Sequence, residues 1–390
     1  MNPYAALGLR TVINADGMKT RLGGSLMSPE VLEAMRLAGG SYVDLMDLHR
    51  AAGRRIAQFI ASPAIEDAAV VCGAAAGLAV ATAAVVAGTD SARIRALPHL
   101  DWPGARTEVV IQKTHVTGYA QGFRNAGPRL VEIGRSDGAT PDEFAAAIGD
   151  RTAAVTFCGG ELPGNARFPT RTSLAELVSI SHARKVPVIV DAAAELPPAE
   201  NLRRFSELGA DLVVFSGGKG LRGPQASGLV LGSHALVDAC RLNQNPNASV
   251  GRPMKVGKEE IMGLLKAVEL YVARDHEADL RTWETYAQTV LDTLHRAGNL
   301  EGVRVERLSY RTIPQVSVIV DAERAGFSAA DLATRLRDGE PSIVPSVAKE
   351  AVTINPQNLE PGEAEQVASR LTQVLTRLAQ PARTPALAAV

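Results

Sequence analysis

The chain has 390 residues, of which 46% are hydrophobic and 21% charged, and its formal net charge at pH 7 is −1. These values are typical of a soluble globular protein, and the length predicts two domains. The near-zero charge argues against a nucleic-acid-binding protein, because neutralising phosphates requires a basic face.

Membrane, secreted and metal-dependent proteins are also disfavoured. The start, MNPYAALGLR, has no basic segment followed by an apolar run, and the apolar stretch 68–88 predicts a strand, a glycine turn and a buried helix. Cys72, Cys158 and Cys240 have no CxxC spacing, which predicts a reducing, cytoplasmic location without disulfides or zinc. The seven histidines form no HExxH pair, so no catalytic metal is expected.

Short apolar runs alternate with helical patterns in the first two thirds of the chain. The runs are continuous and rich in Val and Ile, as in strands that helices cover on both faces. Seven strands are predicted, at 68–72, 108–112, 129–133, 153–157, 187–191, 211–215 and 227–232. Helical spacing appears at 73–88, 140–149 and 172–185. The pattern predicts an α/β fold with a seven-stranded, mostly parallel sheet.

The pattern changes at Lys258, where one long amphipathic connecting helix is predicted to run to a C-cap at Gly298. Strands at 303–308 and 314–321, a helix opening at Ser328 and a last helix after Gly362 predict a smaller α+β domain. The expected division is an N-terminal segment (1–55), a large domain (56–257), the connecting helix with the small domain (258–380) and a frayed tail (381–390).

Asp191 ends the fifth predicted strand and Lys219 follows the sixth. Ligand groups in doubly wound sheets lie at the carboxyl ends of strands, so both side chains are expected in one crevice. A lysine that forms a Schiff base and a carboxylate that holds a pyridinium nitrogen protonated suggest pyridoxal phosphate. The alternative at this point is a structural ion pair beside a glycine-rich turn.

A second feature predicts a phosphate site. The stretch VVCGAAAG passes from a strand through Gly73 and Gly77 into a helix, whose first N–H groups can bind an anion. Ser216, three residues before Lys219, can add a hydroxyl. GxGxxG is absent and SGGKG lacks P-loop spacing, so neither nucleotide motif is indicated; an ordinary tight strand-to-helix turn is the alternative.

Four segments resemble a known family in the order in which that family has them, over nearly the whole chain. They are VINADGMKTRLGG, FSGGKGLRGPQASGLVLG, GRPMKVGK and LEPGEAEQVASRL. The Ser-x-x-Lys-x-x-x-Gly-Pro-Gln block in the second is the most specific part. The chain resembles the fold-type-I pyridoxal-phosphate enzymes that include bacterial selenocysteine synthase and D-glucosaminate-6-phosphate ammonia-lyase.

The resemblance implies roles for particular residues. Lys219 would be linked to the cofactor and Asp191 would face its ring nitrogen. The phosphate cradle would be Gly73, Ala74, Ala75 and Ser216. His115, just past a strand end, is expected to stack on the cofactor ring; the alternative is a helix-start histidine bonded to backbone.

Five cations lie near the family's motifs, namely Arg21, Arg124, Arg222, Arg252 and Lys255. A guanidinium suits carboxylate or phosphate, so two or three of them are expected to bind substrate, with Arg252 and Arg222 first. Each taken singly can equally be a surface charge or an interface ion pair.

The resemblance also implies a reaction that begins with loss of the substrate's Cα proton. With a β-hydroxyl on a small, anionic amino acid, elimination gives a 2-oxo acid and ammonia, as in the ammonia-lyase branch. Racemisation or epimerisation, aldol cleavage, a degenerate cofactor-binding protein and a plain dinucleotide-binding protein are the alternatives. Asp16 stands where a small residue is expected, which leaves the substrate open.

The expected partners are a small-molecule substrate and a second copy of the chain. Selenium transfer on tRNA is disfavoured by the start of the chain at YAALGLRTVINADG, without an extra tRNA-binding domain, and by the charge balance. No nucleic-acid or membrane partner is expected. The family's sites lie at dimer interfaces, and the amphipathic stretch after Lys258 predicts a homodimer or higher homo-oligomer.

Overall fold

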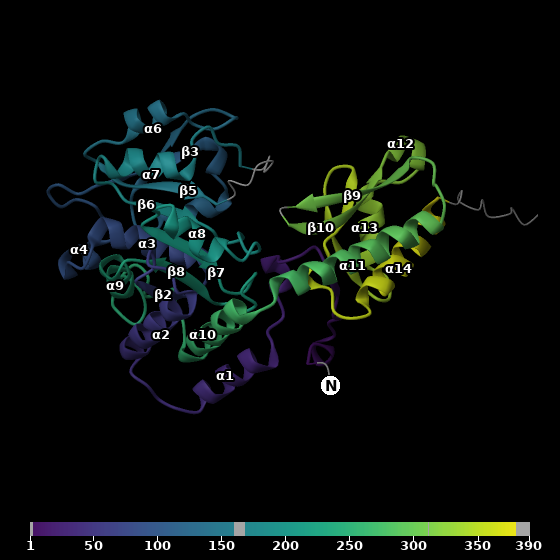
Figure 1. Ribbon diagram of the computed structural model, residues 1–390, viewed down its shortest axis with the longest axis horizontal. Helices are drawn as coiled ribbons and strands as arrows, with labels where there is room; N and C mark the ends of the chain where they lie inside the picture. Colours follow the sequence, from purple (N-terminus) through teal and green to yellow (C-terminus); the bar gives the residue numbers. More distant parts are fainter. Residues whose placement is uncertain (1–2, 160–167, 311, 380–390) are drawn as a thin grey trace, which may run out of the picture. The chain divides into compact units, whose positions relative to one another are not determined.

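The computed structural model describes residues 3–159, 168–310 and 312–379; the predicted tail lies outside this range. The chain divides into two compact units (Figure 1). The larger unit spans Gly23–Arg274, and the smaller one combines Met1–Leu22 with Asp275–Val390. This division differs from the expected one, because the first residues join the C-terminal part and the segment 258–274 belongs to the larger unit.

The larger unit is built on a seven-stranded sheet of order β2-β8-β7-β6-β5-β3-β4. Its strands are β2 (Asp67–Val71), β3 (Glu108–Gln112), β4 (Arg129–Ile133), β5 (Thr152–Cys158), β6 (Val188–Asp191), β7 (Leu212–Ser216) and β8 (Gly228–Gly232). All neighbours pair in parallel except at β8, which is antiparallel to both β2 and β7. The predicted mostly parallel sheet is confirmed, with each strand within a residue or two of its expected position.

Helices cover both faces of this sheet. They are α1 (Pro29–Gly39), α2 (Leu45–Ile60), α3 (Ala74–Ala87), α4 (Ser91–Ala96), α5 (Gln121–Arg124), α6 (Pro141–Ala147), α7 (Leu174–His182), α8 (Asn201–Glu207), α9 (His234–Leu242) and α10 (Lys258–Ala273). Alternate strand residues enter different cores: Val190 packs with α2, α7 and α10, whereas Ile189 packs with α3 and α9. Apart from the edge strand β4, the strands are therefore buried on both sides, which explains their continuous apolar runs.

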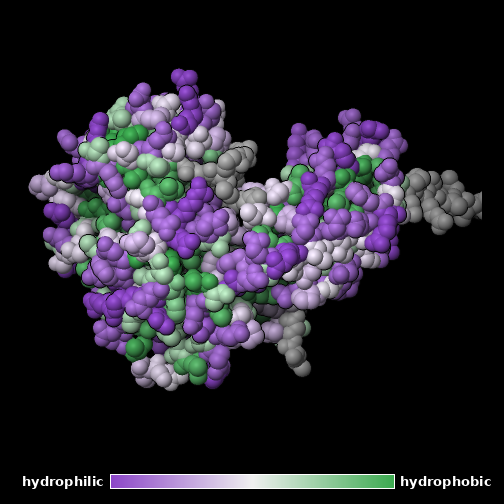
Figure 2. Space-filling view, in the orientation of Figure 1, coloured by the Kyte–Doolittle hydropathy of each residue, from purple (hydrophilic) through white to green (hydrophobic). Residues whose placement is uncertain are grey.

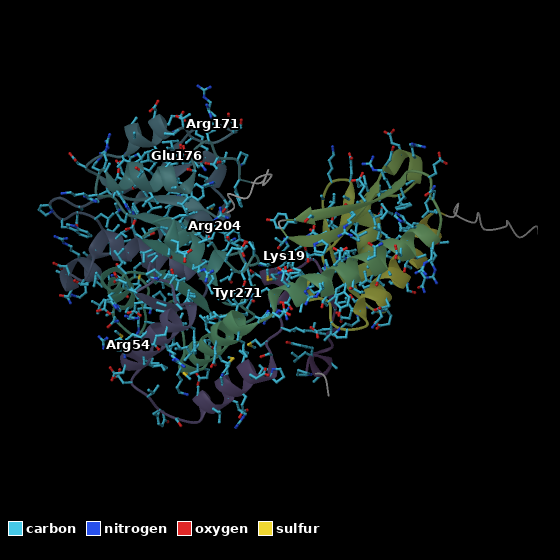
Figure 3. All side chains as sticks on the ribbon, in the orientation of Figure 1. Lys19, Arg54, Arg171, Glu176, Arg204 and Tyr271 are labelled. Carbon is cyan, nitrogen blue, oxygen red and sulfur yellow. The ribbon has the colours of Figure 1, made fainter. Side chains whose placement is uncertain are left out.

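Capping side chains fix where the predicted helices α6 and α7 begin. The hydroxyl of Thr140 accepts the N–H of Glu143, and the Glu143 carboxylate accepts the N–H of Thr140. Ser173 and Glu176 form the same capping box at the start of α7. Figure 3 labels Glu176 on this helix. Each box satisfies two backbone donors that the first helical turn leaves unpaired.

The prediction of one connecting helix from Lys258 to Gly298 is wrong. The chain forms α10 and then α11 (His276–Arg296), separated by Arg274 and Asp275. Arg274 has an extended ψ of 143°, and the Asp275 carboxylate accepts the N–H of Ala278 as the N-cap of the second helix. The break lies in a polar stretch, RDHEAD at 274–279, and periodicity alone does not identify Asp275 as a new cap.

The smaller unit holds a five-stranded sheet of order β1-β11-β12-β10-β9. Its strands are β1 (Ile13–Ala15), β9 (Val303–Tyr310), β10 (Ile313–Val320), β11 (Ile343–Val347) and β12 (Ala351–Ile354). Its helices after α11 are α12 (Ala322–Ala325), α13 (Ala329–Arg337) and α14 (Glu363–Leu378). Ser328 caps α13, and α14 follows Gly362, as the sequence predicts. β1 joins this sheet in parallel with β11.

Hydrophilic residues dominate the visible surface, with smaller hydrophobic patches among them (Figure 2). Among the described residues, no helix is long and apolar enough to cross a membrane. The same residues contain no cluster of three or more His, Cys, Asp or Glu side chains arranged to hold a metal ion. Cys72, Cys158 and Cys240, all within the described ranges, form no disulfide with one another.

Candidate active site at the carboxyl edge of the large sheet

Six strands of the large sheet end at the same edge. Because β8 is antiparallel to both neighbours, β2 runs in the same direction as β7, β6, β5, β3 and β4. The residues that follow these ends include Gly73 after β2, His115 after β3 and Lys219 after β7. This is the edge at which open α/β sheets bind ligands.

Asp191 and Ser216 also point to the same face of the sheet. Two residues earlier in each strand lie Ile189 and Val214, which pack in the core beneath α3. Side chains alternate with a period of two, so the last residues of β6 and β7 project toward the face that α3 covers. Cys158, at the end of β5, pairs in register with Asp191 and shares that face.

Burial raises the pKa of the Asp191 carboxyl above its ordinary value. The N–H of Ala193 donates to Asp191 Oδ1 over 3.0 Å and the charge of Lys219 is felt at the carboxyl; both lower the pKa, but by less than burial raises it. A further cationic N–H group beside the carboxyl would stabilise its charged form. A protonated pyridine nitrogen is such a group, so Asp191 fits the predicted role.

Lys219 stands in a closed turn between β7 and β8. The N–H of Arg222 donates to the Lys219 carbonyl over 2.9 Å, and the N–H of Gly223 donates to the Gly217 carbonyl over 2.8 Å. Arg222 adopts φ of +55°, a left-handed conformation unusual for a residue other than glycine. The turn fixes the lysine's backbone at the strand end, with its charge sensed by Asp191.

The start of α3 is built to receive an anion. Gly73 is its N-cap, with φ of +116°, and no side chain caps the helix there. No acidic residue lies in the first turn of this helix, whose first N–H groups have no partners within the helix. The helix dipole adds positive potential at the same point. Ala74, Ala75 and the hydroxyl of Ser216 therefore fit a phosphate group.

Two glycines let α3 and the sheet approach closely at this point. A Cβ on Gly228, the first residue of β8, would lie 2.6 Å from the Gly73 carbonyl carbon and 2.9 Å from the Ala74 nitrogen. A Cβ on Gly77 would lie 2.6 Å from Val214 Cγ1. Gly228 pairs with Ser216 across the sheet, so this close approach sets Ser216 near the start of α3.

His115 is a buried, neutral histidine in a short 3-10 helix after β3. Its side chain is 2% exposed, and burial lowers its pKa to about 3. The N–H of Cys158 donates to His115 Nδ1 over 3.0 Å, and the Gln112 amide nitrogen lies 2.6 Å from Nε2. The edge of the ring faces Phe157, with centroids 4.8 Å apart. The backbone-bonded histidine of the alternative interpretation is thus present, and the ring orientation is fixed.

The predicted substrate cations have different surroundings. Arg222 is partly buried in the Lys219 turn. Exposed Arg252 donates to Asn245 Oδ1 over 3.1 Å, and Lys255 is also exposed. Arg124 lies 3.5 Å from the Glu132 carboxylate, so its charge is partly balanced.

Arg21 belongs to the smaller unit, where its guanidinium lies 2.7 Å from the Asp16 carboxylate. Asp16 is buried, and the ammonium of Lys19 lies 3.9 Å from its other oxygen. Asp16, which stands where a small residue was expected, therefore balances the positive charges of Arg21 and Lys19. Arg21 is less available to an anionic substrate than its sequence position suggests.

Three neighbours of this site were not predicted from the sequence. Cys158 holds His115 through its backbone, Gln112 contacts the same ring, and Ser25 donates to the carbonyl of Lys219. Gln112 ends a predicted strand and Cys158 comes directly after another, which is a signal that could have identified them. Ser25 carries no such signal, because its contact joins segments 194 positions apart.

Comparison with known proteins agrees with this arrangement. Residues 12–326 match the L-seryl-tRNA selenium transferase family. A 5'-C-glycyluridine monooxygenase-decarboxylase of Streptomyces sp is 38% identical over 381 residues, covering 95% of this chain and 92% of that protein. A D-glucosaminate-6-phosphate ammonia lyase of Salmonella typhimurium is 30% identical over 380 residues, covering 96% and 98%.

The fold is shared with a solved structure. The structure titled D-glucosaminate-6-phosphate ammonia-lyase superposes with a TM-score of 0.80 at 29% identity, covering 97% of this chain and all of that one (100%). The predicted fold-type-I architecture is confirmed by this likeness.

Proposed function

The chain belongs to the L-seryl-tRNA selenium transferase family and is an enzyme, and from this premise we propose that it is a pyridoxal-phosphate-dependent lyase. The proposed reaction is α,β-elimination from a small, anionic hydroxy-amino acid. The observation that carries the proposal is the placement of Asp191, Lys219 and the uncapped start of α3 at one edge of the sheet. An acid, an amine and an anion site are the three groups that this cofactor needs.

Each part of the site has a distinct task in this proposal. When bound, pyridoxal phosphate supplies an electron sink for a carbanion at the substrate's Cα. The N–H groups of Ala74 and Ala75 and the hydroxyl of Ser216 bind the phosphate, and Asp191 holds a proton at the ring nitrogen. The neutral ring of His115 stacks and does not donate a proton near pH 7, because its pKa is about 3.

Lys219 has two tasks. Its Nζ holds the cofactor covalently, and in its neutral form the same amine moves the proton at the substrate's Cα. Arg222 and Arg252, with Arg21 and Arg124 as further candidates, bind the anionic groups of the substrate. In the net reaction the Cα–H, Cα–N and Cβ–O bonds break, and the water lost in elimination is regained when ammonia is released and the 2-oxo acid forms.

A second candidate function rests on the 38% identical relative, which is named a monooxygenase-decarboxylase. Loss of the Cα proton and loss of the carboxylate as carbon dioxide leave different carbanions at Cα, but the same electron sink would stabilise either, and molecular oxygen could then oxidise the decarboxylated one. The second candidate is therefore an oxygen-dependent decarboxylation of an amino acid that bears a glycyl group, with one oxygen molecule as co-reactant.

A substrate screen separates the two candidates. With a panel of hydroxy-amino acids and their phosphates, the purified enzyme is expected to release ammonia and a 2-oxo acid in equal amounts without consuming oxygen. Oxygen uptake with carbon dioxide release would instead support the second candidate. Release of the opposite enantiomer, or of an aldehyde, would show a racemase or an aldolase. A protein that gave no near-visible absorbance band with the cofactor would contradict both.

We also propose a homodimer or higher homo-oligomer, with the N-terminal segment 1–55 in the interface. Large apolar side chains on and beside α1 are exposed, Leu26 by 70%, Leu37 by 59% and Tyr42 by 104%. Such a surface favours burial against another protein. Light scattering is expected to give at least twice the chain mass, and a fully active monomer would contradict the proposal.

We further propose a reducing, cytoplasmic location, supported by three cysteines that form no disulfide, which cell fractionation would check.

A further inference from the structure

The segment Gly23–Ser25 lies against the turn that carries Lys219, within the larger unit. The N–H of Ser25 donates to the Gly218 carbonyl over 3.0 Å, and its hydroxyl donates to the Lys219 carbonyl over 2.8 Å. One residue therefore holds two consecutive carbonyls of the turn, across 194 positions of sequence. The position of Ser25 relative to the Lys219 turn is therefore fixed by tertiary contacts and not by local backbone propensity.

Gly24 shows how closely the two segments fit. It has φ of +77°, and a Cβ at this position would lie 2.1 Å from the Gly218 carbonyl oxygen and 2.3 Å from Gln225 Oε1. Any larger residue would separate the segment from the turn. The contact is thus a close backbone approach that requires glycine, with Ser25 placed immediately after it.

The Lys219 carbonyl accepts donors from both sides. Within the turn it accepts the N–H of Arg222 over 2.9 Å, and from outside it accepts the Ser25 hydroxyl. Arg222 reaches this position in a left-handed conformation, which is strained for a residue with a side chain. A strained turn stays closed when neighbouring contacts hold it, and Ser25 supplies such contacts.

We propose that Ser25 is a positioning residue for Lys219. Its hydroxyl keeps the turn closed and so keeps the lysine amine aligned with Asp191. Ser25 acts through the backbone of Lys219 and does not touch the reacting atoms. The expected effect of Ser25 on kcat rests on the proposed function. Its expected effect on the closure of the Lys219 turn does not, because that effect does not need the cofactor.

The experiment compares Ser25→Ala with wild type and with Ser28→Ala. Ser25→Ala removes the hydroxyl and keeps the backbone N–H. Ser28 lies three positions away and caps α1 by accepting the N–H of Val31 over 3.4 Å, so its variant loses a bond of similar kind elsewhere. Ser25→Thr keeps a hydroxyl and serves as the rescue. If Ser25→Ala does not fold, Ser25→Cys, which is nearly isosteric and a weak donor, takes its place.

The first readout is hydrogen exchange in the cofactor-free protein. Losing one neutral hydrogen bond should speed exchange at the amides of Arg222 and Gly223 about 5-fold, because the turn opens more often. Ser28→Ala should leave these amides at the wild-type rate, and Ser25→Thr should restore it. Wild-type exchange in Ser25→Ala would overturn the proposal whatever the enzyme catalyses.

The second readout uses the cofactor-loaded enzyme. A misplaced lysine should lower kcat about 100-fold while KM changes little, since Ser25 does not bind substrate. The pH titration of the near-visible absorbance band should shift in Ser25→Ala and not in Ser28→Ala. Equal losses in both variants would indicate a merely structural role and overturn the inference. A wild type without the band would contradict the proposed function, while the exchange result would still decide the role of Ser25 in the turn.

Discussion

Replacing Lys219 with alanine is expected to lower kcat by about 10,000-fold or more. The amine is the group that both holds the cofactor and moves the Cα proton, so its removal eliminates two functions at once. The near-visible absorbance band should be absent from the variant. In wild type, borohydride reduction should bleach the band and add the mass of the reduced cofactor to the peptide that contains Lys219.

Two further variants make the result specific. Lys219→Arg keeps the positive charge beside Asp191 but cannot form the covalent link, so it should be as inactive as the alanine variant. Lys349→Ala changes an exposed lysine of the smaller unit and should retain wild-type activity and absorbance. An active Lys219→Arg enzyme would mean that the lysine acts as a charge, such as a phosphate clamp, and would contradict the covalent role.

Six of the seven strands of the large sheet could be predicted because they are buried on both faces; the exception is the edge strand β4, whose residues are exposed or half-buried. A strand such as β6 sends Val190 into one core and Ile189 into the other, so its apolar run is uninterrupted. Continuous apolar runs of this kind can be recognised as strands without knowing which other strands they pair with. The predicted positions of Asp191 and Lys219 follow from the same fact, since both lie where such a run stops.

The smaller sheet was less predictable because its strands depend on distant partners. β1 has three residues, which is too short for a periodic pattern, and it pairs with β11 near the other end of the chain. The break between α10 and α11 is similar in kind. Arg274 ends one helix and Asp275 begins the next through a single cap, which the hydrophobic spacing on either side does not identify.

The residues of the candidate site also differ in how far the sequence predicts them. Strand ends identify Asp191, and the glycine turn identifies Gly73, because both are local signals. Ion pairs are harder to predict even at short range: Asp16 and Arg21 lie five positions apart, but no sequence pattern marks the two as partners. Ser25 and Lys219, which are in contact, lie 194 positions apart in the sequence. Sequence reasoning therefore finds groups that do chemistry more readily than groups that hold them.

Replacing Asp191 with asparagine should leave the covalent link intact and still lower kcat about 1,000-fold, the scale of losing a preorganised electrostatic contact. Asparagine is nearly the same size but carries no charge, so it cannot keep the ring nitrogen protonated. The near-visible band should remain, because Lys219 is unchanged. Stopped-flow absorbance with substrate should show slow loss of the Cα proton, and a deuterium label at Cα should give a larger isotope effect than in wild type.

The charge, and not the volume, is what this variant tests. Asp191→Glu keeps a carboxylate and should retain more activity than Asp191→Asn, even though its longer side chain fits less well. Burial raises the pKa of Asp191 in the protein without cofactor, and a cationic nitrogen beside it would lower that pKa again. The charged acid and the cationic ring should therefore stabilise one another. Wild-type kcat in Asp191→Asn would mean that the buried acid has only a structural role, while the lysine could still carry the chemistry.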